Sequence, residues 1–390
     1  MRRVRLKEIG TFYSGLSGKS KSDFSEGNAL LVTYRNIFNN PVLNPAIKDT
    51  VVVGKDEKQN EVLWGDILIT GSSETPADAG MSSVVLFNPQ EKMYLNSFCF
   101  GFRLNDMNEA LPSYIGHLLR STSIRAAISK TAFGVTRFNV NRMRFADIEI
   151  PLPPLNIQKE IVSILDSFTS LIDKMKQEVE MRKKQMEYYR EKLMAPQKNW
   201  EIKTLGEIGT FTRGNGLQKS DFRVKGFPCV HYGQIHTYYN TCIYKTKSFC
   251  EEDLAKKLQK ASYCDLLIAT TSEDVKACCK AAVWFGAGDV AYSGDSFCYS
   301  HDQDPKYMAY LFQTEMFAKQ KQKAATGAKV IRVSGESMAS FSFAFPPLVQ
   351  QRQIASILDT FETYISKLEK MIELRQKQYE YYREKLLTFE

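Results

Sequence analysis

The sequence predicts an α+β protein with a pseudo-twofold internal repeat: two similar strand-rich domains joined by two long antiparallel coiled-coil helices. Three observations predict it. Residues 153–193 recur at 346–386 without a gap, a constant offset of 193 residues (346 − 153). Both copies carry apolar residues at heptad spacing. The segments of about 150 residues before each copy share a framework of apolar and turn positions.

The two repeated stretches predict long helices. Their apolar residues, in 161–193 and in 354–386, are mostly separated by alternating steps of four and three, which is typical of a coiled-coil seam. Each helix would be about 50 Å long at 1.5 Å per residue. Arg182 and Arg375 interrupt the two seams at the same place. A matched polar interruption can fix register, so we expect the two helices to occupy equivalent positions in one assembly.

The globular segments predict short strands with few helices. The expected divisions are a first domain at 1–152, a first helix at 153–195, a second domain at 196–345 and a second helix at 346–390. In the first domain, apolar clusters bounded by Gly, Asn and Pro predict strands within 28–38, 41–53, 62–70, 82–87, 96–104 and 147–153. Residues 111–130 have helical spacing and predict at least one helix, and 131–141 is expected to be a loop.

The second domain repeats the framework of the first but not its polar residues. Glu-Ile-Gly-Thr-Phe at 8–12 returns at 207–211, and Tyr34 and Ile37 return as Tyr232 and Ile235. A common framework with different polar residues is what two domains for two different ligands would show. The alternative is that loops simply diverged, because loops tolerate change.

Composition favours a non-catalytic protein with a nucleic acid as a possible partner. The net charge of +8 permits nucleic acid without demanding it. No apolar run could span a membrane and no signal peptide is visible, so a cytoplasmic protein is expected. The eight cysteines form no CxxC pair and the four histidines lack zinc-finger spacing; reduced, buried thiols are favoured over a metal site. Phosphate-loop, HExxH, GxSxG and Asn/Asp-Pro-Pro-Tyr motifs are absent.

The order domain, helix, domain, helix suggests the kind of ligand. With the helices antiparallel, each end would carry one domain. Two binding domains at a fixed spacing suit a linear, periodic ligand, and duplex DNA is the obvious one.

The repeated motifs also carry a family resemblance. Each long helix is entered through Pro-Pro-Leu and neighbouring glutamines, such as Gln158 and Gln351. Each continues through Ile-Leu-Asp-x-Phe, at 164–168 and 357–361, and ends on Tyr-Tyr-Arg-Glu-Lys-Leu. In this doubled layout the chain resembles, over essentially its whole length, the specificity subunit of type I restriction-modification systems.

The resemblance implies a function and a set of partners. Such a subunit has no catalytic activity, and each target-recognition domain recognises one half of a bipartite double-stranded DNA site. The spacer helices set the gap and dock two modification subunits, which methylate adenine; motor-nuclease restriction subunits then join. No cofactor or metal is expected on this chain, whereas S-adenosylmethionine, ATP and Mg²⁺ are expected on the partners.

Loop cations and polar side chains are the expected DNA contacts, since phosphates attract Lys and Arg, and base edges pair with Arg, Lys, Asn, Gln, Ser and Thr. In the first domain these are Lys19, Lys21, Arg35, Asn36, Ser72, Ser73, Thr75 and Arg137. In the second domain they are Arg213, Lys219, Tyr232, Gln234, Thr271, Ser272, Lys329 and Arg332. Each could instead be an ordinary solvated loop residue. Tyr34, Tyr232 and Phe138 could stack on bases, with core packing as the alternative.

The helices supply the expected seam and partner interface. Its residues are Leu165, Phe168, Ile172, Arg182, Tyr188, Tyr189, Leu358, Phe361, Ile365, Arg375, Tyr381 and Tyr382. The four tyrosines are expected to anchor the modification subunits, because aromatic residues dominate interface energetics.

Two other function classes stay open at this point. One is a protein-only scaffold or decoy that binds modification subunits without recognising DNA. The other is a fused methylase or nuclease, which the missing motifs disfavour. The sequence does not give the DNA target.

Overall fold

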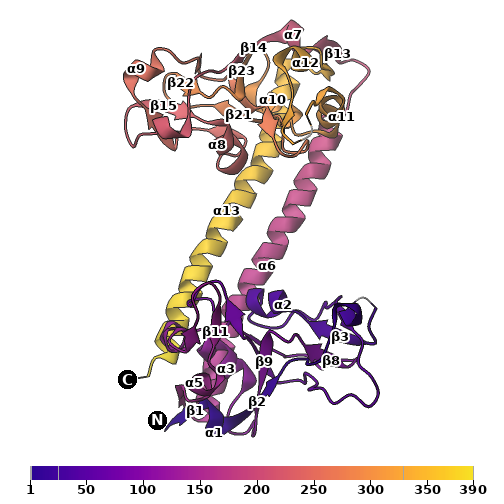
Figure 1. Ribbon diagram of the computed structural model, residues 1–390. Helices are drawn as coiled ribbons and strands as arrows, with labels where there is room; N and C mark the ends of the chain where they lie inside the picture. Colours follow the sequence, from indigo (N-terminus) through magenta and orange to yellow (C-terminus); the bar gives the residue numbers. More distant parts are fainter. Residues whose placement is uncertain (1, 25, 328, 390) are drawn as a thin grey trace. The chain divides into compact units, whose positions relative to one another are not determined.

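The computed structural model describes residues 2–24, 26–327 and 329–389. The chain divides into two compact units. Unit 1 comprises 1–176 and 370–390, and unit 2 comprises 177–369. Each unit holds one strand-rich head and segments of two long helices, α6 (Leu155–Leu193) and α13 (Leu348–Leu387) (Figure 1). The expected division at 152, 195 and 345 stays a prediction.

Among its described residues, the head of unit 1 contains four small sheets. The largest has the strand order β2-β9-β5-β7 and is antiparallel throughout: Gly10–Ser14, Cys99–Leu104, Ile67–Thr70 and Ser82–Val84. The others are β4-β3-β8 (Thr50–Val51, Ala29–Val32, Met93–Leu95), β10-β11-β6 (Ala132–Phe133, Phe138–Val140, Ser72–Ser73) and β1-β12 (Arg2–Arg5, Glu149–Leu152). The helices are α1 (Leu6–Ile9), η1 (Lys21–Phe24), α2 (Tyr34–Asn39), α3 (Pro112–Leu119), α4 (Thr122–Ser129) and α5 (Arg142–Ala146).

The head of unit 2 repeats this plan. Its main sheet has the order β14-β23-β19-β21-β16: Gly209–Arg213, Ser296–His301, Leu266–Ala269, Lys280–Trp284 and Cys242–Ile243. The others are β17-β15-β22-β18 (Ser248–Cys250, Phe227–Val230, Val290–Tyr292, Lys260–Ala261), β20-β24 (Thr271–Ser272, Ile331–Arg332) and β13-β25 (Glu201–Thr204, Ser342–Phe345). The helices are α7 (Leu205–Ile208), η2 (Lys219–Asp221), α8 (Tyr232–Thr237), α9 (Glu252–Ala255), α10 (Pro305–Leu311), α11 (Glu315–Ala324) and α12 (Gly335–Ala339).

The central strand of each head is buried on both faces. In β5, Ile67 and Ile69 belong to one apolar cluster and Leu68 to another. In β19, Leu266 and Leu267 divide between two clusters in the same way. Successive side chains of a strand point to opposite faces. Both strands therefore read as continuous apolar runs rather than alternating ones.

The helix seam lies where the heptads predict it. In unit 1, Leu165 and Ile172 are buried, and the ring of Phe168 stacks on Tyr382 with centroids 5.4 Å apart. In unit 2, Leu358 and Ile365 are buried, and Tyr189 stacks on Phe361 at 5.6 Å. Tyr189 and Tyr382 are therefore seam residues. Tyr188 and Tyr381 are 59% and 61% exposed and are free to contact a partner.

Two local predictions in the first domain were wrong. The second half of 28–38 is helix α2, because Tyr34, Ile37 and Phe38 share one helical face, with Ile37 buried and the rings of Tyr34 and Phe38 stacked at 5.7 Å. The helical pattern at 111–130 forms two helices, α3 and α4. They separate at Arg120, whose guanidinium donates to the Ser82 and Ile37 carbonyls.

The second correction concerns 131–141, which is a β-hairpin (β10–β11) rather than a loop. Its turn depends on Gly134, with φ of +130°. A Cβ there would lie 2.1 Å from the Arg137 carbonyl oxygen, so only glycine fits.

Candidate nucleic-acid interface

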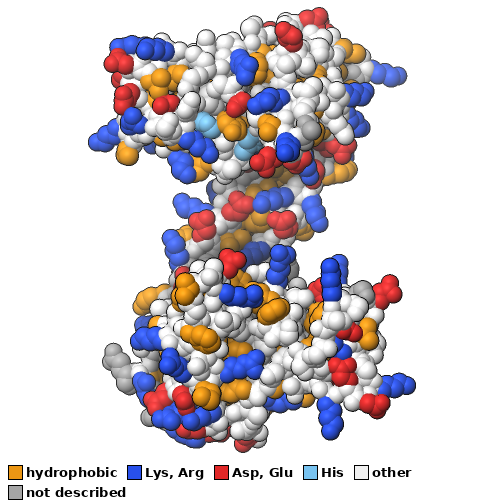
Figure 2. Space-filling view, viewed as in Figure 1, with side chains coloured by type: hydrophobic (Ala, Val, Ile, Leu, Met, Phe, Trp, Pro, Cys, Tyr) orange, Lys and Arg blue, Asp and Glu red, His pale blue; other side chains and the backbone are white. Residues whose placement is uncertain are grey.

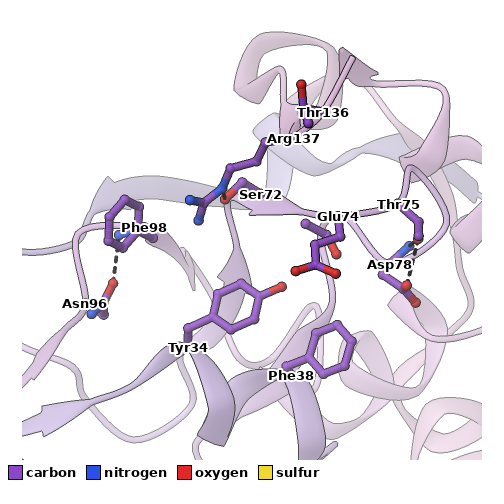
Figure 3. A pocket seen from close by; sticks show the side chains of 11 residues that line it. Tyr34, Phe38, Ser72, Glu74, Thr75, Asp78, Asn96, Phe98, Thr136 and Arg137 are labelled. Carbon is purple, nitrogen blue, oxygen red and sulfur yellow. Dashed lines mark hydrogen bonds between the residues drawn. The ribbon is translucent and has the colours of Figure 1, made fainter. Parts of the chain in front are cut away.

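A cavity of about 590 Å³ opens on the head of unit 1 (Figure 3). It is formed by α2, β6 with the loop that follows, the segment before β9, and the β10–β11 hairpin. Four predicted DNA-contacting residues line it: Ser72, Ser73, Thr75 and Arg137. Tyr34, named as a possible stacking residue, lines it too, together with Phe38, Glu74 and Phe98, which the sequence reasoning missed.

Arg137 is held in place at this cavity. Its Nε donates a hydrogen bond to the Ser72 hydroxyl at 3.0 Å, and its guanidinium carbon lies 5.1 Å from the centre of the Phe98 ring. Among the described residues its two terminal nitrogens have no hydrogen-bond partner. A guanidinium fixed on one edge and one face presents its remaining N–H groups as a ready fork.

A second cavity, of about 480 Å³, opens on the head of unit 2 and is lined by the predicted residues Arg213 and Tyr232. Arg213 Nε donates to the Gly294 carbonyl at 3.1 Å. Asp295 lines the same cavity, and its carboxylate accepts a hydrogen bond from the Thr271 hydroxyl at 3.1 Å. His231 lies in the cavity wall, and its pKa is lowered first by its own burial and then by the charge of nearby Lys219.

The two cavities overlap only in part: Tyr34 and Phe98 of the first correspond to Tyr232 and Asp295 of the second, whereas the second is lined mainly by 213–218. Tyr34 and Tyr232 each begin the helix that follows the third strand of their head, β3 and β15. The residue before β9 is Phe98, whereas the residue before β23 is Asp295. The residue before β11 is Arg137, whereas the residue before β24 is Val330. In unit 2 the cavity cation comes instead from β14, as Arg213.

Several predicted contacts are already used inside the protein. The Lys19 side chain is only 8% exposed and forms an ion pair with Glu57, whose pKa this contact lowers to about 2. The Asn36 amide donates to the Asn44 carbonyl and accepts from the Asn44 backbone N–H. The Gln234 amide donates to Ser248 and accepts from the His231 backbone N–H. Lys19, Asn36 and Gln234 are therefore left out of the proposed DNA-contacting set.

The remaining predicted residues lie around the cavities. Lys21 and Arg35 are exposed outside the first one, and Thr75 donates to the Asp78 carboxylate at 2.7 Å. In unit 2, the Ser272 hydroxyl accepts a hydrogen bond from the Asp274 backbone N–H. Lys329, just before β24, and Arg332, within β24, are exposed. Arg332 pairs with Thr271 across the β20–β24 ladder.

Residues that the sequence reasoning undervalued fasten each head to the helices. Gln158 is fully buried; its amide oxygen accepts from the Leu111 N–H at 2.9 Å, and its nitrogen donates to the Glu109 and Pro153 carbonyls. Gln351 does the same in unit 2 with the Asp304 N–H and the Pro346 carbonyl. These are the glutamines that follow Pro-Pro-Leu. The repeated motif therefore has a structural role: it joins each head to a long helix through hydrogen bonds.

Two other repeated motif residues also hold the heads. The aspartate of Ile-Leu-Asp-x-Phe accepts from His117 in unit 1, as Asp166 at 2.8 Å, and from Tyr310 in unit 2, as Asp359 at 2.8 Å. The glutamate of Tyr-Tyr-Arg-Glu-Lys-Leu accepts from the first N–H of a head helix. Glu384 binds Thr122 N–H of α4 in unit 1, and Glu191 binds Glu315 N–H of α11 in unit 2. Each head is thus fastened to both long helices.

The outer faces of the helices carry exposed apolar residues at heptad spacing. In unit 1 these include the pairs Ile164 and Leu171, and Leu374 and Tyr381. In unit 2 they include Met181 and Tyr188, and Ile357 and Tyr364. Residues seven apart lie on one face of a helix.

The two seam arginines form hydrogen bonds or ion pairs along their own helices, and Arg182 also contacts the other helix. Arg182 pairs with Glu178 at 3.3 Å, and its guanidinium lies 5.4 Å from the Tyr364 ring in a groove of about 540 Å³. Arg375 donates to Gln378 at 2.6 Å.

Charge is mixed on the visible surface of both units. Figure 2 shows Lys and Arg interspersed with Asp and Glu on each head.

All eight cysteines are free. Over residues 2–24, 26–327 and 329–389, no three His, Cys, Asp or Glu side chains are grouped to hold a metal ion. No helix in the described ranges is long and apolar enough to cross a membrane.

Fold and sites together define a class: a protein with two related heads, each with an aromatic and polar cavity of its own chemistry. Each head is fastened to a pair of long helices through the same three helix residue types, a glutamine, an aspartate and a glutamate. Comparison with known proteins supports a more specific assignment. The family model described as "Type I restriction modification DNA specificity domain" matches residues 1–181 and again 197–376. The chain therefore belongs to the family of type I restriction-modification DNA specificity subunits.

Individual relatives agree. A type I restriction enzyme specificity subunit of Escherichia coli is 30% identical over 256 residues, covering 62% of this chain and 63% of that protein. A crystal structure of a type I restriction-modification S subunit from M. genitalium matches with a TM-score of 0.56 at 14% identity, covering 100% of this chain and 96% of that one. A chain from a study of type I system assembly matches with a TM-score of 0.60 at 14% identity, covering 99% and 97%. The structural matches support the fold with two heads and two long helices.

Proposed function

We propose that this chain is the non-catalytic subunit that gives a cytoplasmic type I restriction-modification complex its DNA specificity. Each head recognises one half of a bipartite, asymmetric duplex site. The observation that carries this proposal is the contrast between the cavities: one scaffold presents Arg137 on Phe98 in unit 1, and Arg213 with Asp295 in unit 2. The same backbone with different polar groups suits recognition of two different sequences.

Mixed surface charge supports recognition through base edges as well as through phosphates. Exposed cations outside the cavities, such as Lys21, Arg35 and Lys329, are proposed to contact phosphates. The cavity residues Ser72, Ser73 and Arg137, and Arg213 and Tyr232, are proposed to approach the bases.

The long helices are proposed to set the gap between the half-sites and to dock two modification subunits, one on each unit. The support is the exposed apolar residues at heptad spacing in both units. Partner helices would cover that face, with Tyr188 and Tyr381 as aromatic anchors. Motor-nuclease restriction subunits would then join, and S-adenosylmethionine, ATP and Mg²⁺ would bind to partners.

The experiment is a map of methylated adenines in a host that expresses this chain with its modification subunit, and in the same host without this gene. We expect a bipartite motif that appears only with the gene. Replacing the head of unit 1 should change one half of the motif and leave the other half intact. A stable complex with no gene-dependent methylation would contradict the proposal and favour a protein-only scaffold.

A further inference from the structure

We propose that the β10–β11 hairpin of unit 1 enters the major groove, and that Arg137 recognises one guanine there through its O6 and N7 atoms. This inference rests on the proposed function and assigns one base to one residue.

The hairpin has the shape and exposure for this role. A two-stranded β-ribbon fits the major groove of B-DNA. The hairpin turn is fully displayed to solvent: Val135 is 92% exposed, and Phe133 before it is also exposed. Figure 3 shows Thr136 and Arg137 on one side of the cavity, with Tyr34 and Phe38 on the other.

The guanidinium of Arg137 is preorganised for two parallel hydrogen bonds. Ser72 holds its Nε, and Phe98 supports its face. Ser72 is itself buried, so this anchor is rigid. The N–H groups that remain unpaired have the geometry that matches guanine O6 and N7, the commonest specific arginine contact in DNA complexes.

The surroundings favour a base over a phosphate as the partner of Arg137. Glu74 and Asp78 line the same cavity, and their carboxylates repel phosphate. The exposed Glu74 has no hydrogen-bond or ion-pair partner among the described residues. Its carboxylate can therefore accept a hydrogen bond from the amino group of a cytosine or an adenine. Three aromatic rings in the wall, those of Tyr34, Phe38 and Phe98, keep the site apolar around these charges.

Unit 2 offers an internal comparison. Val330 stands where unit 1 has Arg137, and Asp295 stands where it has Phe98. Unit 2 therefore lacks the same device, and the effect of Arg137 should be confined to one half of the target.

The test uses the full chain in complex with its modification subunits. Methylation is mapped, and bound duplexes are selected from a library randomised in both half-sites. For the unchanged complex we expect one strict guanine position in the half-site of unit 1. Arg137→Lys keeps the charge but loses the fork, so it should lower the preference for guanine at that position about tenfold or more. Every other position should keep its preference.

Two further variants sharpen the result. Phe98→Leu removes the ring under the guanidinium and should relax the same position more weakly. Arg144→Lys is the matched control, because Arg144 is an exposed arginine of unit 1 outside the cavity. It should leave the selected motif unchanged. Assembly with the modification subunits verifies that each variant folds.

The outcomes are distinguishable. An unchanged motif with Arg137→Lys overturns the assignment. A uniform loss of affinity for all sequences with Arg137→Ala, with a smaller salt dependence and the same motif, identifies a phosphate contact and also overturns it. If the unchanged complex selects no sequence at all, the proposed function fails, and this inference fails with it.

Discussion

One layer of the core is filled differently in the two heads. Unit 1 has small and apolar residues there: Ala79, Gly80, Ile128 and Phe145. At the corresponding positions unit 2 has two thiols, an ammonium and a thioether: Cys278, Cys279, Lys321 and Met338. The buried Lys321 donates to the carbonyls of Lys276 and Cys278, and burial lowers its pKa. The helix residues that fasten head to helices are, in contrast, of the same type in both units: Gln158 and Gln351, Asp166 and Asp359, Glu384 and Glu191.

The difference shows what the fold requires. A core layer can exchange apolar groups for a buried ammonium when backbone carbonyls accept its hydrogen bonds, as those of Lys276 and Cys278 do for Lys321. A head can therefore change its interior and its cavity while the junction with the helices stays fixed.

The largest expected effect is at the junction, where the two units should respond alike. Gln158→Ala and Gln351→Ala each remove three hydrogen bonds and leave backbone groups buried without partners. Each should lower the free energy of unfolding of its own unit by about 3 kcal/mol. Hydrogen exchange followed by mass spectrometry, compared unit by unit, measures this. The exposed Gln353→Ala is the control, with a change within about 0.5 kcal/mol. A decrease in the free energy of unfolding of less than about 1 kcal/mol in either unit would show that the two glutamines do not play the same role.

Low pH should destabilise unit 2 more than unit 1. Burial lowers the pKa of His301 on β23 to about 4, from 6.5, and Leu104 occupies the corresponding end of β9. The folded state binds this proton less tightly than the unfolded chain does. Stability therefore falls as the pH decreases from about 6.5 to about 4, by about 3 kcal/mol in unit 2.

The check is denaturant unfolding of unit 2 at several pH values. His301→Leu should remove most of the difference between pH 7 and pH 4.5 that is specific to unit 2. An unaltered pH profile would show that other groups cause the acid sensitivity.

The smallest effect concerns one backbone position that the two heads treat differently. Gly80 has φ of +68°, and a Cβ there would lie 2.6 Å from Ile128 Cγ2; Cys279 has φ of +60° and already carries a side chain. Gly80→Ala should cost about 2 kcal/mol from strain and crowding. Cys279→Ala should cost about 1 kcal/mol, because only the buried sulfur contacts are lost. Thermal unfolding monitored in each unit tests this, with Gly54→Ala, whose Cβ would meet nothing closer than 3.7 Å, as the neutral control. Equal costs at the two positions would contradict the argument.

Repetition and periodicity allowed much of the molecule to be predicted from sequence. The heptads predicted the seam, with Leu165 and Leu358 buried, because helical spacing alone fixes which face is apolar. Continuous apolar runs such as the one at 67–70 predicted strands. The hairpin at 131–141 was missed, because its short strands pair with distant β6, and local patterns carry no such information.

The sites needed the tertiary structure. Arg137 and Arg213 were named from the sequence, but so were Lys19, Asn36 and Gln234, whose polar atoms are used by partners inside the protein. Residue type predicts what a side chain can bind, whereas only the fold decides which partner reaches it first. Phe98 and Glu74 carried no signal in the sequence, since an exposed ring and a free carboxylate gain meaning only beside Arg137.

The sequence by itself determined the repeat, the two long helices and the family, because these depend on spacing along the chain. The tertiary structure alone decided which motif residues join the heads to the helices and which loop residues share a cavity. The physical reason is that hydrogen bonds and burial join residues distant in sequence, as Glu384 joins α13 to the first turn of α4.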